Sequence, residues 1–220
     1  MKAWIEEDNI NYEYIIRYLR DTIPERSGHI AEMEQFAKEN DVPISQPESI
    51  RFVEVIHKIA NAKKILELGT AIGYSAIRMT QACGAEVVTV ELSEEMAKEA
   101  EKNFSRAGVG EKVTLIKGDA RQVLKDMEGE EVFDVIFVDA AKGQYMEFFE
   151  HCERLLKKGG VLISDNVLYK GMTATDELVV RRKITIVRRL RKYLEMLKQN
   201  KGFSTALLPI GDGVALSFKE

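Results

Sequence analysis

The chain has 220 residues, a formal net charge of -4 and 45% hydrophobic residues. This length suits one α/β domain with a single core and is short for two. The net negative charge taken alone disfavours a nucleic-acid partner, because binding phosphates needs a positive surface. Cys83 and Cys152 lack zinc-type spacing, and we interpret both as reduced core thiols. No run approaches the roughly 18 apolar residues of a membrane span, and the amino terminus lacks an apolar signal segment, so we expect a cytoplasmic protein without a membrane partner.

The first part of the chain is predicted to be helical. Residues 9–60 contain three helix-like stretches and no convincing strand, with breaks at Pro24 and between Pro43 and Pro47. We therefore predict an amino-terminal helical extension over residues 1–60.

From Lys63 onward, short β runs alternate with amphipathic helices. The predicted strands cover 63–68, 86–91, 113–118, 133–139 and 160–165. The predicted helices cover 74–83, 94–107, 120–128, 144–157 and 176–199. This alternation is typical of right-handed crossovers and a parallel sheet.

The last forty residues follow a different pattern. Two β runs, 204–210 and 213–218, are separated by turn residues that include Gly211 and Asp212, which predicts a C-terminal β-hairpin. The fold class is therefore α/β, with a doubly wound, Rossmann-like, seven-stranded sheet. We expect a single domain over 1–220, with its core at 63–220.

The segment ILELGTAIGYSA places Glu67, Gly69 and Ser75 where the first strand becomes the first helix. Glycine lets the backbone approach a ligand there, and the helix N-terminus offers free N–H donors. The G-x-x-x-G spacing lacks the G-x-G-x-x-G of a pyrophosphate-binding turn, which disfavours a nicotinamide dinucleotide. Glu91 ends the second strand, where an acid can bind both ribose hydroxyls. Asp119 and Ala120 follow the third strand, where they can frame an adenine.

Each of these signals is weak alone, because a strand–glycine–helix turn is usually packing and an acid at a strand end is usually a helix cap. In this order along one chain, they resemble the S-adenosylmethionine-dependent methyltransferases. The resemblance implies ribose, adenine and methionine-end contacts, with Ser45 closing over the methionine carboxylate. The implied cofactor-binding residues are Ser45, Glu67, Gly69, Ser75, Glu91, Asp119, Ala120 and Asp139.

Two apolar strands end in oxygen ligands. Asp139 follows the run FDVIFV, and Asp165 and Asn166 follow VLIS. Neighbouring parallel strands gather such side chains at one sheet edge. Oxygen-only ligation suits a hard divalent cation, Mg²⁺ or Mn²⁺. Without Asp139, a capped turn at Asp165 and Asn166 would be an equal interpretation.

The segments ELGTAIGYS, VDAAKGQY and SDNVLYKG resemble the cation-dependent O-methyltransferases, the class of the catechol and caffeoyl-coenzyme A enzymes. The resemblance implies that the ion binds two adjacent acceptor oxygens, one of them in line with the sulfonium methyl group. It also implies that Lys142 lies beside the nucleophilic oxygen as a catalytic residue, together with Asp139. From the sequence without that motif, Lys142 would be a solvated loop lysine.

Residues 181–201 contain nine Lys or Arg residues and a single acid, Glu195. Apolar residues recur there at helical spacing, so the basic side chains line the opposite face, as in many solvated helices. Charge concentrated close after the metal ligands also fits a phosphate-rich acceptor. The implied tRNA-binding residues are Arg181, Arg182, Arg188, Arg189, Arg191 and Lys192.

With this helix, the motifs are most similar to those of the bacterial tRNA 5-hydroxyuridine methyltransferases, which make 5-methoxyuridine at the wobble position. The resemblance implies tRNA as substrate and a homodimer. Two alternatives stay open. One is O-methylation of a small catechol or a caffeoyl-CoA-like phenol, and the other is a non-catalytic cofactor-binding protein.

Overall fold

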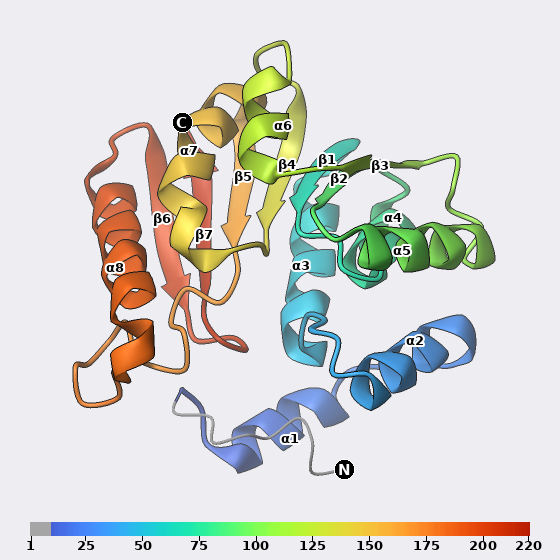
Figure 1. Cartoon of the computed structure of the whole chain (residues 1–220), viewed down its shortest axis with the longest axis horizontal. Helices are drawn as coiled ribbons and strands as arrows, with labels where there is room; N and C mark the ends of the chain where they lie inside the picture. The colour runs from blue at the N-terminus through green and yellow to red at the C-terminus, as the bar shows by residue number, and fades with distance from the viewer. Residues whose placement is uncertain (1–9) are drawn as a thin grey trace.

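A seven-stranded sheet forms the centre of the computed structural model, which describes residues 10–220 (Figure 1). Its strand order is β3-β2-β1-β4-β5-β7-β6, parallel from β3 to β5, while β7 runs antiparallel to β5 and to β6. The strands are β1 Lys64–Leu68, β2 Glu86–Glu91, β3 Val113–Lys117, β4 Phe133–Val138, β5 Leu156–Ser164, β6 Phe203–Leu208 and β7 Val214–Lys219. This topology confirms the predicted doubly wound sheet and its C-terminal hairpin.

Helices cover both faces of the sheet, and each face has its own apolar core. Successive strand residues alternate between the two: Ile65 packs with α2 to α5, whereas Leu66 packs with α6 to α8. The α-helices are α1 Glu13–Asp21, α2 Gly28–Glu39, α3 Pro47–Ile59, α4 Tyr74–Cys83, α5 Glu94–Arg106, α6 Ala120–Asp126, α7 Tyr145–Leu155 and α8 Ile184–Gln199. Two 3₁₀ turns, η1 Lys142–Gln144 and η2 Arg181–Lys183, precede α7 and α8. Within residues 10–220, no helix is both long enough and apolar enough to span a membrane.

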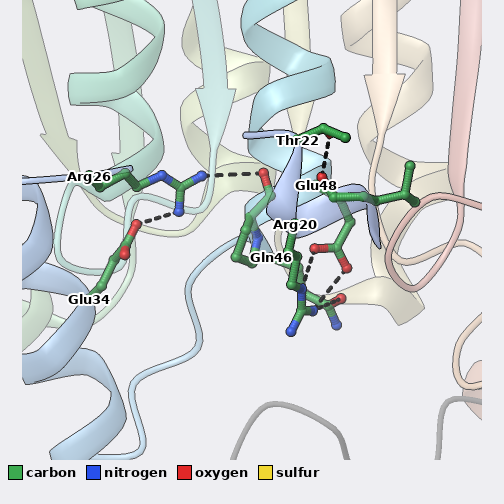
Figure 2. A network of polar contacts seen from close by, with 8 residues as sticks. Arg20, Thr22, Arg26, Glu34, Gln46 and Glu48 are labelled. Carbon is green, nitrogen blue, oxygen red and sulfur yellow. Dashed lines mark hydrogen bonds and ion pairs between the residues drawn. The ribbon is translucent and has the colours of Figure 1, made fainter. Parts of the chain in front are cut away.

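The amino-terminal extension forms the three predicted helices, although residues 1–9 lie outside the described part of the chain. A largely buried ion pair joins the first and third helices, because Arg20 Nε and Nη2 lie 2.7 and 2.9 Å from the two Glu48 oxygens (Figure 2). Helix α3 packs against α4, the helix that follows the first strand. The extension is thereby attached to the end of the sheet where the parallel strands terminate (Figure 1).

Two predicted boundaries are wrong. The fifth strand starts at Leu156, four residues before the predicted 160, because Leu156 pairs with Phe133 before the register shifts. The predicted helix over 176–199 begins only at Ile184 as an α-helix. The first residues of the predicted helix form a loop instead. Asp176 lies in this loop, and its carboxylate pairs with Arg191 at 2.6 Å.

Replacing Gly213 with alanine tests the turn of the hairpin. Gly213 has a φ of +85°, and an added Cβ would lie 2.3 Å from Leu168 Cγ. We expect Gly213→Ala to lower the free energy of unfolding by about 2 to 4 kcal/mol, through strain and the clash together. Gly159 is the matched control, since it has a φ of +73° and no atom within 4 Å of an added Cβ. Urea denaturation should show the smaller loss for Gly159→Ala, and equal losses would contradict the clash.

Candidate cofactor and metal site

A cavity of about 680 Å³ opens where β1, β2, β4 and β5 end. It gathers nearly all of the residues that the sequence marks as site residues. Those lining it are Ser45, Gly69, Ser75, Glu91, Asp119, Ala120, Asp139, Lys142, Asp165 and Asn166. Residues separated by more than a hundred positions therefore face one space.

The turn after β1 lies directly against the end of β4. Gly69 has a φ of +101°, and a Cβ there would lie 2.1 Å from the backbone oxygen of Asp139. The Asp139 N–H donates to Leu68 O at 2.9 Å, which fixes the approach. Glycine is needed here for close packing of two strand ends as well as for access to a ligand.

Glu91 is held rigidly at the cavity wall. Its two carboxylate oxygens accept the N–H groups of Ala71 and Ser93, each at 2.8 Å. Each oxygen keeps a further lone pair for a ligand hydroxyl. This arrangement suits the ribose role that the sequence suggests.

Glu67 differs from the other predicted cofactor residues because it does not line the cavity. Its side chain is fully buried beneath the wall, where Oε2 accepts from Thr89 Oγ1 at 2.5 Å. Burial raises the pKa of Glu67 to about 7. Direct contact between Glu67 and a cofactor therefore stays a prediction. In the structure Glu67 lies beneath the part of the cavity wall that Ser75 and Gly69 form.

Asp119 is the N-cap of α6 and also lines the cavity. It accepts the Arg121 N–H at 2.9 Å and the Arg121 guanidinium at 2.6 Å. Hydrogen bonds from Arg121 hold the pKa of this carboxyl below its usual range. The helix-cap interpretation is therefore correct for Asp119, and Ala120 is the first residue of the capped helix.

Asp139 and Asp165 face the same cavity from the ends of β4 and β5. Asp165 is 2% exposed, and its Oδ1 accepts the Asn166 N–H at 2.7 Å. Burial raises the pKa of both carboxyls, and the charge of Asp139 raises that of Asp165 further. Two neighbouring carboxylates that repel each other, one of them buried, form a donor set that a cation would stabilise.

The residues at this point fit a hard divalent cation. Among residues 10–220, no three His, Cys, Asp or Glu side chains converge as a metal site, so the amide oxygen of Asn166 is needed beside the two carboxylates. Asn166 has a φ of +56°, a left-handed conformation that asparagine tolerates better than most residues. Asp139, Asp165 and Asn166 would therefore hold the ion through oxygen atoms alone, as Mg²⁺ and Mn²⁺ prefer.

Lys142 begins η1 and lines the cavity with both carboxylates. Burial dominates the raised pKa of Asp139, and the Lys142 charge opposes that rise, so the two groups interact. A lysine in this position can take a proton from an acceptor or hold its oxyanion.

The cavity has further lining residues that sequence reasoning did not assign to the site, among them Tyr169, Lys170 and Asp212. The hairpin turn packs on the loop after β5, since the N–H groups of Val167 and Leu168 donate to Gly213 O and Asp212 O. The sequence identifies the turn but carries no signal that it contacts this loop.

The basic residues near α8 lie outside the cavity and fall into two groups. Arg189 donates to Gly143 O at 3.1 Å, and Arg191 donates to Thr173 O at 3.0 Å, so both hold loops. Arg189 is itself exposed, as are the remaining predicted tRNA-binding residues, Arg181, Arg182, Arg188 and Lys192.

Comparison with known proteins identifies the family. A family model described as O-methyltransferase matches residues 24–220. The chain belongs to this O-methyltransferase family.

Relatives of several kinds support the assignment. The chain is 31% identical to the catechol O-methyltransferase of Niastella koreensis, over 96% of this chain and 98% of the relative. It is 29% identical to caffeoyl-CoA O-methyltransferase 1 of Zea mays, over 98% and 86%. The solved O-methyltransferase of Bacillus cereus in complex with SAH is 28% identical, with a TM-score of 0.83 over 94% and 97%.

The chain is thus an S-adenosylmethionine-dependent O-methyltransferase of the caffeoyl-CoA and catechol type. The divalent cation, the tRNA acceptor, the homodimer and the cytoplasmic location stay predictions.

Replacing Glu91 with glutamine tests the cofactor end of the cavity. Glutamine offers one acceptor oxygen where Glu91 offers two, so it cannot keep both backbone bonds and the ribose contact. We expect S-adenosylhomocysteine to bind on the order of tenfold more weakly to Glu91→Gln, as for loss of a charge-assisted hydrogen bond. Calorimetric titration measures this, with Glu95→Gln on the exposed face of α5 as control. Unchanged affinity would remove Glu91 from the site.

Proposed function

We propose that this protein transfers a methyl group to one of two adjacent oxygens of a catechol-like acceptor, with a divalent cation in the site. The observation that carries the proposal is that the carboxylate of Asp139 and the buried carboxylate of Asp165 face one cavity, which Glu91 also lines. The predicted cofactor contact of Asp139 leaves Asp165 without a role, whereas a divalent cation would bind both carboxylates. The names of the catechol and caffeoyl-CoA relatives support a phenolic acceptor.

In this proposal the chain binds and orients the reactants. S-adenosylmethionine supplies an activated methyl group on sulfur, and a divalent cation supplies a Lewis acid that acidifies the acceptor hydroxyl. Lys142 accepts the hydroxyl proton or holds the resulting oxyanion. The acceptor oxygen gains the methyl group as the carbon–sulfur bond breaks, which leaves S-adenosylhomocysteine. Tyr145 donates to Asp165 O at 2.8 Å and so keeps the β5 end in place.

The double variant Asp165→Ala with Asn166→Ala tests the metal role. It removes two of three proposed ligands and leaves Ser45, Glu91 and Ala120 of the cofactor half in place. We expect methyl transfer to fall by at least about a hundredfold, because loss of ligands from a catalytic metal site removes its Lewis acid. S-adenosylhomocysteine affinity should persist.

The control is wild-type protein treated with EDTA and then given Mg²⁺ or Mn²⁺. Its activity should disappear with the chelator and return with the metal. Undiminished transfer by the double variant in chelator-treated buffer would refute the metal role.

A second candidate acceptor is the 5-hydroxyuridine of tRNA. Uracil O4 and the 5-hydroxyl are vicinal oxygens, so they offer the same chelate as a catechol. Support comes from the exposed cations of η2 and α8, because α8 packs against η1, which carries Lys142. Backbone phosphates could meet these side chains while an extruded base enters the cavity.

Charge reversal of the exposed cations separates the two acceptors. The reversed residues are Arg181, Arg182, Arg188 and Lys192, each to Glu. A small neutral catechol should be methylated within about twofold of the wild-type rate, because it gains little from distant charge. Transfer to tRNA should fall at least about tenfold, because phosphate contacts dominate such binding.

Incorporation of tritiated methyl into each acceptor measures both rates, with tRNA taken from a strain that lacks the enzyme. A matched control reverses four exposed lysines elsewhere: Lys38, Lys58, Lys98 and Lys158. If wild-type protein labels only the phenol, the tRNA candidate is eliminated.

A further inference from the structure

A side cavity of about 260 Å³ lies between the amino-terminal helices and the start of α4. It shares Ile44, Ser45 and Tyr74 with the main cavity, so the two spaces meet at these residues. The residues that line it are Arg20, Arg26, Glu34, Ile44, Ser45, Pro47 and Tyr74. None of them belongs to the proposed metal end of the site.

Arg26 is the central cation of this side cavity. Its side chain is only 10% exposed, and its Nη1 pairs with Glu34 Oε1 (Figure 2). Its Nη2 donates to Pro47 O at 3.3 Å, whereas its buried Nε has no hydrogen-bond partner among the described residues. Desolvating a guanidinium in this way is costly unless a further negative group helps to balance it.

The negative charge near Arg26 is shared. Glu34 Oε1 also accepts the Tyr74 hydroxyl at 2.5 Å, so the same oxygen serves two donors. Arg20 brings a second guanidinium to the lining, although it is already paired with Glu48. Each guanidinium therefore has one carboxylate partner, and the buried Nε–H of Arg26 is the donor that an anionic ligand could still satisfy.

The two cavities meet at Ser45 and beside Ser75, the residues that the family resemblance assigns to the methionine end of the cofactor. Tyr74 precedes Ser75, and Ser45 lies 3.5 Å from Asp139 Oδ2. A carboxylate bound there would meet Asp139 and the buried Glu67, both unfavourable to a negative charge. The cations that line the main cavity are Arg121, Lys142 and Lys170. Each follows a different strand, and none of them lines the side cavity.

We propose that Arg26, together with Arg20, supplies the positive charge that positions the carboxylate at the methionine end of the cofactor. The side cavity brings this charge to the junction, and the N–H groups at the start of α4 add to it. Glu34 holds the Arg26 guanidinium in place through their ion pair. The helical extension is then a part of the cofactor site. The proposal rests on S-adenosylmethionine as cofactor and is independent of the acceptor and of the metal ion.

Three ligands distinguish the contribution of the carboxylate to binding from that of the rest of the cofactor. S-adenosylhomocysteine carries it, 5′-methylthioadenosine lacks the whole amino acid part, and decarboxylated S-adenosylmethionine lacks the carboxylate alone. Titration calorimetry of metal-free protein with each ligand reports binding without any turnover. For Arg26→Gln we expect S-adenosylhomocysteine to bind about tenfold more weakly, as for loss of one charge-assisted contact. The other two ligands should bind as they do to wild type.

Two further variants guard against a merely structural effect. Arg26→Lys keeps the charge and should restore most of the selectivity for S-adenosylhomocysteine. Arg78→Gln removes a similarly buried guanidinium, 15% exposed and paired with Glu54, that does not line the side cavity. It should lower the melting temperature without changing the ratio of the S-adenosylhomocysteine and 5′-methylthioadenosine affinities.

The outcomes are distinct. A selective loss for S-adenosylhomocysteine in Arg26→Gln, recovered in Arg26→Lys, supports the proposal. An unchanged affinity ratio in Arg26→Gln overturns it, whether all ligands weaken together or none does. Wild-type protein that binds none of the ligands would overturn it as well, whereas a failure to methylate any catechol would count only against the proposed acceptor.

Discussion

The site depends on the parallel pairing of β4 with β5, which brings two carboxylates together at one end of the sheet. Val138 is opposite Ser164 in the register, and the Asp165 N–H donates to Val138 O at 2.9 Å. The next residue along each strand is therefore an aspartate at the same sheet edge. Mutual repulsion and the burial of Asp165 oppose this arrangement, and a bound cation would relieve both costs.

Much of this could be predicted from the sequence, because it depends on local patterns. Continuous apolar runs identify buried parallel strands, and the acids that follow them are expected at one edge of the sheet. Asp139, Asp165 and Glu91 were found in this way, and the family motif added Lys142. The boundaries were harder, since Leu156 extends β5 across an irregular register that two following glycines obscured.

The missing parts of the site depend on contacts between distant segments. Asp212 reaches the cavity because the hairpin turn packs on the loop after β5. Arg26 lines the adjoining side cavity, which Tyr74 at the start of α4 also lines. No sequence pattern predicts either contact, because the segments involved are far apart in the chain. Glu67 is also placed by the fold in a way that the motif alone does not show. Strand alternation places it beside Ile65, on the face that α4 covers, so an acid next to the glycine turn lies under the cavity wall.

The basic segment shows why charge alone does not identify a binding surface. Arg189 and Arg191 belong to the same run of cations as Arg188, yet they donate to Gly143 O, next to Lys142, and to Thr173 O, in the segment after the proposed metal ligands. Reversing their charge would disturb these loops as much as any surface. The exposed side chains alone can report on an acceptor that carries phosphate. Because a small phenol needs no such surface, the exposed cations of η2 and α8 are the part of this protein where the two proposed acceptors make different demands.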